Sequence, residues 1–300
     1  MIALSTSWYS TERIDVKKML EQVLSTGVSG IEIGYNLTSP QLKELQQALH
    51  NTSLKVVSVH NYSPVPDPVK GRFFTDLYRI SSLDEHERSK AVEYSKRTID
   101  TARQFGAGVI VVHAGTVESV TEQSRELYKL YRQGAGSELF TKSRDAFMQL
   151  RAVESKRYLE NTVRSLDEIT TYAVANGVLI GLETRFYPNE IPNFEEIRYL
   201  LGLFGGQGLR YWHDVGHAEV TSRLGLADHL AFLREYAHHL IGFHLHDVID
   251  LHDHLAPFTG SVDYSLLQPY LKKDVLKVIE AHSPATVEQI QKAVEFLTHF

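Results

Sequence analysis

Short apolar segments recur along the chain, and each is followed by a stretch with helical periodicity. The eight segments are Ile2–Ser5, Gly30–Tyr35, Leu54–His60, Gly108–Gly115, Gly177–Glu183, Leu209–Val215, Leu240–Asp247 and Asp274–His282. They are rich in β-branched residues and almost continuously apolar, which is typical of parallel strands buried on both faces. Amphipathic stretches such as Asp84–Phe105 and Asn161–Asn176 separate them, and glycines follow these stretches where a helix would end. Alternating β and α units predict either a closed barrel or a doubly wound sheet.

Ligand-type side chains stand at the C-terminal ends of these segments. They are His60, His113, Glu183, Asp214, His244 and Glu280. A closed barrel gathers all strand ends on one rim, where barrel enzymes hold their active sites, whereas an open sheet spreads them along a line. No G-x-G-x-x-G follows the first segment, which disfavours a dinucleotide-binding sheet. We therefore predict an α/β fold, a (β/α)8 TIM barrel formed as a single domain over residues 1–300.

Two connections are longer than a barrel crossover needs. Asn61–Leu83 contains SPVPDPV and is predicted to be an irregular loop over the barrel mouth. Residues 116–158 keep helical periodicity on both sides of the break RQGAGS, which predicts an inserted helical hairpin after the fourth strand. A lid and an oligomer contact both fit such an insertion, and the oligomeric state stays open.

The composition of the chain excludes some kinds of site and disfavours some kinds of partner. The chain has no cysteine, which excludes disulfides, thiolate metal sites and cysteine nucleophiles. Its formal net charge of −6 provides no global basic field for nucleic acid or for a membrane surface. The amino terminus has no basic stretch followed by an apolar run, and no apolar run approaches the roughly 20 residues that span a bilayer. We therefore expect a cytoplasmic protein without a membrane partner.

The 15 histidines, many of them beside Asp or Glu, point to a metal centre. Three pairs stand out: Asp214 and His217 in WHDVGHAE, His244 and His246 in FHLHD, and His252 and His254 in DLHDHLAPFTG. Imidazoles and carboxylates that converge from separate segments are the ligands of a divalent cation. Unpaired buried charges are costly, so this cluster of histidines and carboxylates predicts a bound divalent cation. The carboxylates favour manganese, magnesium or cobalt, and the histidines favour zinc.

The ordered motifs SVHNYSPVP, VVHAG, GLETR, WHDVGHAE, FHLHD, DHLAPFTGSVDY and VIEAH resemble those of the xylose-isomerase-like TIM-barrel superfamily. That superfamily includes sugar isomerases and epimerases and also apurinic endonuclease IV. The resemblance spans nearly the whole chain. Its motifs are specific for the fold and for a metal site, and they do not specify the reaction.

The resemblance implies roles for individual residues. Those that match the four ligands of the single metal in ketose 3-epimerases are Glu183, Asp214, His244 and Glu280. His60 and His113 match ligands that, together with the glutamate at the position of Glu183, hold a further zinc ion of the endonuclease. His217 and His254 match two ligands of its third zinc ion.

The chain departs from the family pattern at two positions. The aspartate of the endonuclease's third zinc site falls at His252, which would itself be a ligand of a histidine-rich site, although Asp250 or Asp253 could take its place. Phe258 stands where the family usually has a glycine, before the T-G pair. Glu32 in GIEIGY could contact the substrate, but we expect it to form a structural salt bridge.

The favoured hypothesis is a metal-dependent sugar or sugar-phosphate isomerase or epimerase. Glu183 and Glu280 would transfer protons on opposite sides of the reacting carbon through a metal-stabilised enediolate. The residues expected to contact the substrate are His217, Arg185, Trp212 and Tyr187. For the two aromatic residues, ordinary packing is the alternative role.

The alternative hypothesis is an endonuclease IV-like phosphodiesterase that acts at abasic DNA sites with three metals. The segment Asp247–Asp263 opposes it, because it carries four aspartates and no lysine or arginine. DNA binding depends on basic groups that contact phosphates. A non-catalytic carbohydrate-binding barrel, which would need no metal, is a third hypothesis. We therefore favour a small sugar as the partner over nucleic acid.

Overall fold

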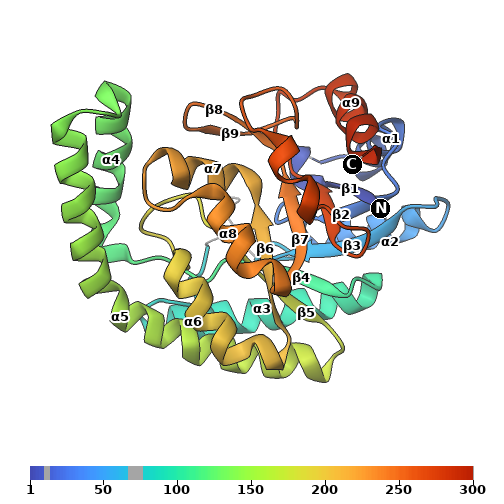
Figure 1. Cartoon of the computed structure of the whole chain (residues 1–300). Coiled ribbons are helices and arrows are strands. Elements are labelled where there is room, and N and C mark those ends of the chain that lie inside the picture. The colour runs from blue at the N-terminus through green and yellow to red at the C-terminus, as the bar shows by residue number, and fades with distance from the viewer. Residues whose placement is uncertain (10–13, 67–76, 300) are drawn as a thin grey trace.

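Parallel strands close into a barrel in the computed structural model, which describes residues 1–9, 14–66 and 77–299 (Figure 1). Within these residues the strands of the barrel are β1 (Ile2–Ser5), β2 (Gly30–Ile33), β3 (Lys55–His60), β4 (Val109–Val112), β5 (Leu179–Glu183), β6 (Leu209–Asp214), β7 (Leu240–Leu245) and β10 (Leu276–Ile279). They follow the order β1-β10-β7-β6-β5-β4-β3-β2 around the barrel. The predicted TIM barrel is confirmed.

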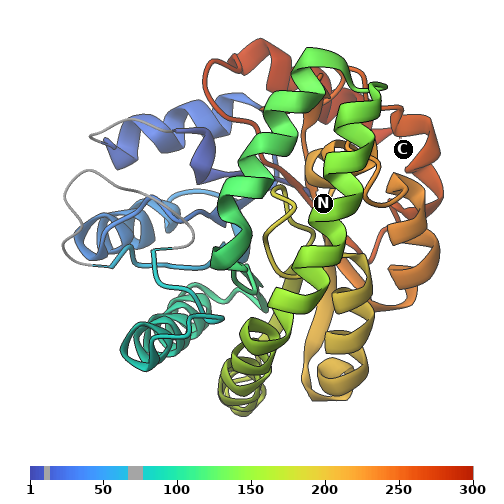
Figure 2. The same cartoon turned by 90° about the vertical axis from the view of Figure 1, so that its left-hand side faces the viewer.

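Helices surround the barrel and connect its strands (Figures 1 and 2). They are α1 (Val16–Ser25), α2 (Ser39–Leu49), α3 (Glu85–Phe105), α4 (Thr121–Gly134), α5 (Glu138–Ala175), α6 (Phe194–Phe204), α7 (Val215–Arg223), α8 (His229–Tyr236) and α9 (Val287–Thr298). The predicted helix over Asp84–Phe105 is α3. Its N-cap, Asp84, accepts a hydrogen bond from the Glu87 amide, and it ends at Gly106, whose φ of 72° is left-handed.

The predicted helical insertion after the fourth strand is also confirmed, and it consists of α4 and the first part of α5. Figure 2 shows this pair of helices lying across the end of the barrel. The helix α5 is 38 residues long, so the second arm of the insertion and the expected Asn161–Asn176 helix are one continuous element. The Tyr128 hydroxyl of α4 donates a hydrogen bond of 2.9 Å to the Phe186 carbonyl, which ties the insertion to the loop after β5.

A second, small sheet follows β7. The strands β8 (Asp247–Ile249) and β9 (His252–Leu255) pair antiparallel and form a hairpin. Asp247, expected at the end of the seventh barrel strand, begins this hairpin. The centre of the predicted Asn61–Leu83 loop, residues 67–76, lies outside the described residues. Among the described helices, none is long and apolar enough to cross a membrane.

The interior of the barrel below its mouth is filled by apolar side chains. One cluster consists of Ala3, Val109, Val111, Trp212 and Val278. A methyl group added at Gly242 would lie 2.2 Å from the Trp212 ring, and one added at Gly181 would lie 3.0 Å from it. The strands on either side of β6 therefore carry glycines because the indole occupies the space in front of them.

Trp212 was expected to wall the substrate pocket, and its position corrects that expectation. The side chain is fully buried and lies beneath His244, with the ring centroids 5.0 Å apart. It is absent from the described residues that line the cavity at the mouth. Packing, the alternative role, fits the position of this tryptophan.

Candidate metal centre

Four buried side chains meet at the C-terminal ends of β5, β6, β7 and β10. They are Glu183, Asp214, His244 and Glu280, and one potential ligand atom of each lies within 4.8 Å of those of the others. Nδ1 of His244 lies 2.7 Å from Oε1 of Glu183 and 2.9 Å from Oε2 of Glu280. The structure therefore brings together the residues that the family resemblance matched to a single metal site.

The charges of this cluster make it suitable for a cation. Burial opposes ionisation of Glu183, but His113 and His244 hold the pKa of this carboxyl well below its usual value. Burial also opposes protonation of His244, yet the Glu280 and Glu32 carboxylates raise its pKa well above the ordinary value. Three carboxylates facing one imidazole keep an excess of negative charge in a buried place. Such a set of oxygen and nitrogen donors fits a divalent metal ion.

Glu32 orients His244 from the side opposite to the cluster. Both of its carboxylate oxygens lie 3.2 Å from Nε2 of His244, and the Ser58 hydroxyl donates a 2.7 Å hydrogen bond to one of them. An imidazole that donates one N–H to a carboxylate presents its other nitrogen to a metal in a defined direction. The expected salt bridge of Glu32 is therefore part of the site. The signal available in the sequence was its place in GIEIGY, where alternate side chains point into the barrel.

A second group shares Glu183 with the first. Nε2 of His113 lies 2.7 Å, and Nε2 of His60 lies 3.4 Å, from Oε2 of Glu183. Nδ1 of His60 donates to the Asn61 carbonyl oxygen 2.9 Å away, so Nε2 is the ring nitrogen that faces the glutamate. The two oxygens of Glu183 thus face two different groups of candidate ligands. This arrangement could hold a second ion beside the first.

A third group consists of His217, His246 and His254, whose ring nitrogens lie within 4.8 Å of one another. Nδ1 of His246 accepts a 2.9 Å hydrogen bond from the His254 amide, so Nε2 must carry the hydrogen, and it lies 2.9 Å from Oδ1 of Asp214. Both nitrogens of His246 are therefore engaged. We assign it the role of orienting Asp214 rather than of binding metal, a role that its spacing of two from His244 did not reveal.

The third group takes its carboxylate from Asp253 and not from the position that the family pattern indicated. Oδ2 of Asp253 lies 3.0 Å from Nδ1 of His254 and 3.5 Å from Nε2 of His217. His252 has an exposed side chain, and in the described part of the chain it joins none of these groups. We therefore replace His252 by Asp253 among the candidate ligands. The backbone of β9 decides this: His254 has a φ of 56°, which breaks the alternation of side chains along the strand, so Asp253 and His254 line the same cavity while His252 is exposed.

His282 lies two residues beyond Glu280, and no role for it was predicted from the sequence. Its ring stacks on His254 with centroids 3.9 Å apart. Burial and the neighbouring His254 lower the pKa of His282 to about 3, so it is neutral at pH 7. The alternation of side chains along a strand was the signal that could have placed it beside Glu280.

Backbone conformation explains one departure from the family pattern. Phe258 has a φ of 65°, which lies in the left-handed region that glycine adopts most easily. Its ring packs against that of Tyr264, with the centroids 4.3 Å apart and the ring planes tilted by 37°. The loop therefore keeps a glycine-like path although a phenylalanine occupies the position. His254 also has a positive φ, 56°, and such strain occurs preferentially at functional sites.

A cavity of about 440 Å³ opens above the three groups, a volume in the range of small-molecule sites. Of the residues expected to contact substrate, Arg185, Tyr187 and His217 line it. Nη1 of Arg185 lies 3.4 Å from Oε2 of Glu183, and Nη2 lies 2.7 Å from Oε1 of Glu190. Tyr35 also lines the cavity, a position that the sequence analysis missed. We will call this space the metal-side cavity.

Comparison with known proteins is consistent with this architecture. Residues 20–299 match the family model described as xylose isomerase-like TIM barrel. The chain belongs to this family. Among curated proteins, no sequence match was found.

Solved structures with the same fold share little sequence with this chain. A D-tagatose 3-epimerase-like protein is 20% identical, with a TM-score of 0.64 over 99% of this chain and 96% of that one. A putative xylose isomerase from Rhodospirillum rubrum is 14% identical, with a TM-score of 0.73 over 99% and 98%. The IolI protein with a bound zinc atom is 16% identical, with a TM-score of 0.68 over 99% and 96%. At these identities the similarity establishes the fold alone.

Proposed function

We propose that this protein is a metal-dependent sugar or sugar-phosphate isomerase or epimerase. The observation that carries the proposal is that Glu183 and Glu280 both lie against Nδ1 of His244 and both line the metal-side cavity. They come from β5 and β10, which are separated in the barrel by β6 and β7. Two carboxylates that approach one point from different sides suit proton removal and proton return at one carbon. The structural similarity to a D-tagatose 3-epimerase-like protein supports this choice.

The four candidate ligands have different roles in the proposed reaction. Glu183, Asp214, His244 and Glu280 would hold a divalent cation, whose chemistry would be Lewis-acid stabilisation of the negative charge that develops on the sugar. One glutamate removes the proton from the carbon, and the other supplies a proton to it. Deep burial excludes water from both carboxylates and so strengthens their electrostatic interactions.

Two further residues are placed to hold the substrate. Nδ1 of His217 lies 2.9 Å from the Thr184 carbonyl oxygen and donates to it, so Nε2 carries a lone pair that can accept a hydrogen bond from a sugar hydroxyl. Arg185 is buried at the edge of the metal-side cavity and can donate to a hydroxyl or to a phosphate. We propose that these two residues set the orientation of the sugar.

One observation favours the endonuclease-like alternative. The groups around His60 and His113, and around His217 and His254, lie beside the central four residues, as a site for three ions would require. The acidic segment Asp247–Asp263 still opposes a DNA partner, because Asp253 faces the same cavity. We therefore keep phosphodiester cleavage as the second candidate.

Metal counting and proton exchange test the proposal together. We expect one tightly bound ion per chain by elemental analysis, and incorporation of solvent deuterium at the reacting carbon of a ketose such as D-tagatose, followed by mass spectrometry. In His60→Ala and His113→Ala variants, the ion held by the central four residues remains. Three tightly bound ions, no exchange with any ketose or ketose phosphate, and cleavage of abasic-site DNA would refute the sugar chemistry and support the alternative.

A further inference from the structure

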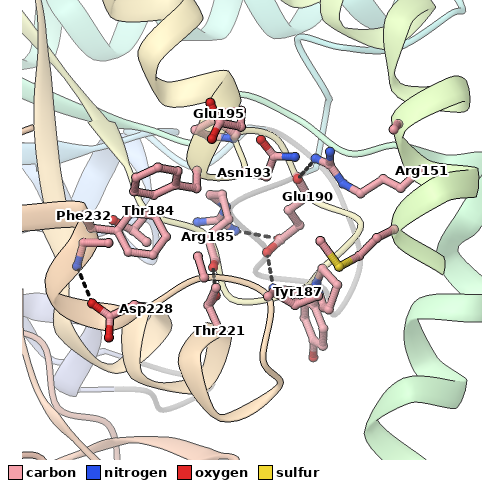
Figure 3. A pocket seen from close by; sticks show the side chains of 18 of the residues that line it. Arg151, Thr184, Arg185, Tyr187, Glu190, Asn193, Glu195, Thr221, Asp228 and Phe232 are labelled. Carbon is pink, nitrogen blue, oxygen red and sulfur yellow. Dashed lines mark hydrogen bonds and ion pairs between the residues drawn. The ribbon is translucent and has the colours of Figure 1, made fainter. Parts of the chain in front are cut away.

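A second cavity adjoins the metal-side cavity, and the proposed function leaves it without a role. It has a volume of about 400 Å³ and lies between α5, the loop after β5, and the segment that leads into α8 (Figure 3). We will call it the side cavity. Arg185, Tyr187 and Glu190 line both cavities. These three residues therefore form the boundary between the two cavities.

The walls of the side cavity are mainly apolar. They include Phe147 and Met148 of α5, Pro188 and Pro192 of the loop after β5, and Phe232 of α8. Met148 is 43% exposed and Tyr187 is 51% exposed, so large apolar groups at this cavity face water. Apolar walls with few polar groups characterise sites that enclose an apolar part of a small molecule. Methionine and aromatic side chains adapt well to such a group.

The two buried arginines that line the side cavity are each paired with a carboxylate. Arg185 donates to Glu190, as Figure 3 shows, and Arg151 donates to both carboxylate oxygens of Glu196 at 2.8 Å. These buried pairs leave little net charge for a charged ligand to neutralise. Asp228 and Glu195 stand exposed among the lining residues and disfavour an anion. The side cavity is thus suited to a neutral group.

We infer that the side cavity binds a neutral aromatic or aliphatic group attached to the sugar, so that the substrate is a substituted sugar and not a free monosaccharide. The sugar part would lie over the candidate metal ligands, and its substituent would extend past Tyr187 between α5 and α8. This inference rests on the proposed function for the identity of the sugar part. It assigns to the helical insertion a direct contact with substrate, because Phe147, Met148 and Ala152 of α5 line the side cavity.

A pair of alanines on α5 provides a matched test. Ala152 lines the side cavity, whereas Ala146 does not, and both have exposed side chains. The Ala152→Phe variant places a ring in the side cavity, and the Ala146→Phe variant places the same ring on another surface of the helix. Thermal melting followed by circular dichroism checks that both variants fold.

The first measurement uses phenol, a neutral ring without a sugar, and determines its dissociation constant by saturation-transfer NMR. We expect Ala152→Phe to weaken phenol binding by about tenfold or more, because the added ring occupies the same space. Ala146→Phe leaves the binding unchanged. Equal phenol binding by the three proteins, or no binding to any of them, overturns the inference.

The second measurement compares 6-O-benzyl-D-fructose with 6-O-methyl-D-fructose by calorimetry on the metal-loaded protein. We expect the benzyl ether to bind on the order of tenfold more tightly, and this advantage to disappear in Ala152→Phe and to persist in Ala146→Phe. No advantage for the benzyl ether contradicts the inference. Phenol binding requires neither metal nor sugar, so it persists if only the proposed sugar chemistry is wrong. If only the inference is wrong, metal binding and deuterium exchange persist.

Discussion

Two layers of side chains inside the same barrel have opposite chemistry. The lower layer contains Val111, Gly181, Trp212, Gly242 and Val278, and the upper layer contains His113, Glu183, Asp214, His244 and Glu280. Each residue of the upper layer follows one of the lower layer by two positions on the same strand or just beyond it. Because side chains of a strand alternate between two faces, both layers point into the barrel.

The difference between the layers shows how the fold supports the site. The lower layer is filled by the Trp212 ring and by small neighbours that make room for it. This ring packs beneath His244 and gives the charged layer a rigid, dry floor. Ligands that are supported in this way keep their positions when a substrate binds. The lower layer therefore contributes chiefly stability, and the upper layer contributes chemistry.

The largest effect on activity is expected in the upper layer. Glu183→Gln or Glu280→Gln should reduce kcat by about 10²- to 10⁴-fold, because the neutral amide cannot accept the proton. The fold should persist in both variants, as circular dichroism can show. Glu295→Gln, on the exposed face of α9, is the control and should retain full activity. Full activity of both glutamate variants would contradict the assigned proton transfers.

The next effect is expected in the lower layer, where a substitution should change the stability of the fold. In Gly242→Ala the added methyl group would lie 2.2 Å from the Trp212 ring, so the free energy of unfolding should fall by about 1–3 kcal/mol. Urea denaturation measures this change. In the control Gly202→Ala, on α6, nothing lies within 4 Å of the added carbon. The control should be neutral or stabilised by up to about 1 kcal/mol, and equal stability of both variants would argue against a filled lower layer.

The smallest effect concerns the support of the upper layer. Glu32→Gln should weaken metal binding by about 10- to 100-fold, because the amide orients the His244 ring less strongly than the carboxylate does. Calorimetric titration of the metal-free protein with Mn²⁺ or Zn²⁺ measures this. His252→Ala should leave the affinity unchanged, because this side chain is exposed. Equal loss of affinity in both variants would restore His252 to the candidate ligands.

The local pattern of apolar and polar residues was sufficient to predict most of the barrel. The strands, the helix α3 and the insertion after β4 all follow from periodicity and from helix-ending glycines. The continuity of α5 was missed near Tyr158, although no glycine or proline interrupts Glu138–Ala175. The β8–β9 hairpin was missed as well, because its strands of three and four residues are too short to show a hydrophobic period.

The sequence by itself determined the succession of strands along the chain and the candidate ligands at their ends. Both can be recognised within a single segment, from its apolar residues and from the polar residue that follows them. Tertiary structure alone decided which partners meet. Glu32 and His244 belong to β2 and β7, and no local pattern relates them. The choice of Asp253 over His252 depends on the path of a loop in which His254 and Phe258 have a positive φ. The side cavity likewise exists only because α5, the loop after β5 and α8 pack together, and contacts between segments so far apart in sequence are formed only when the chain folds.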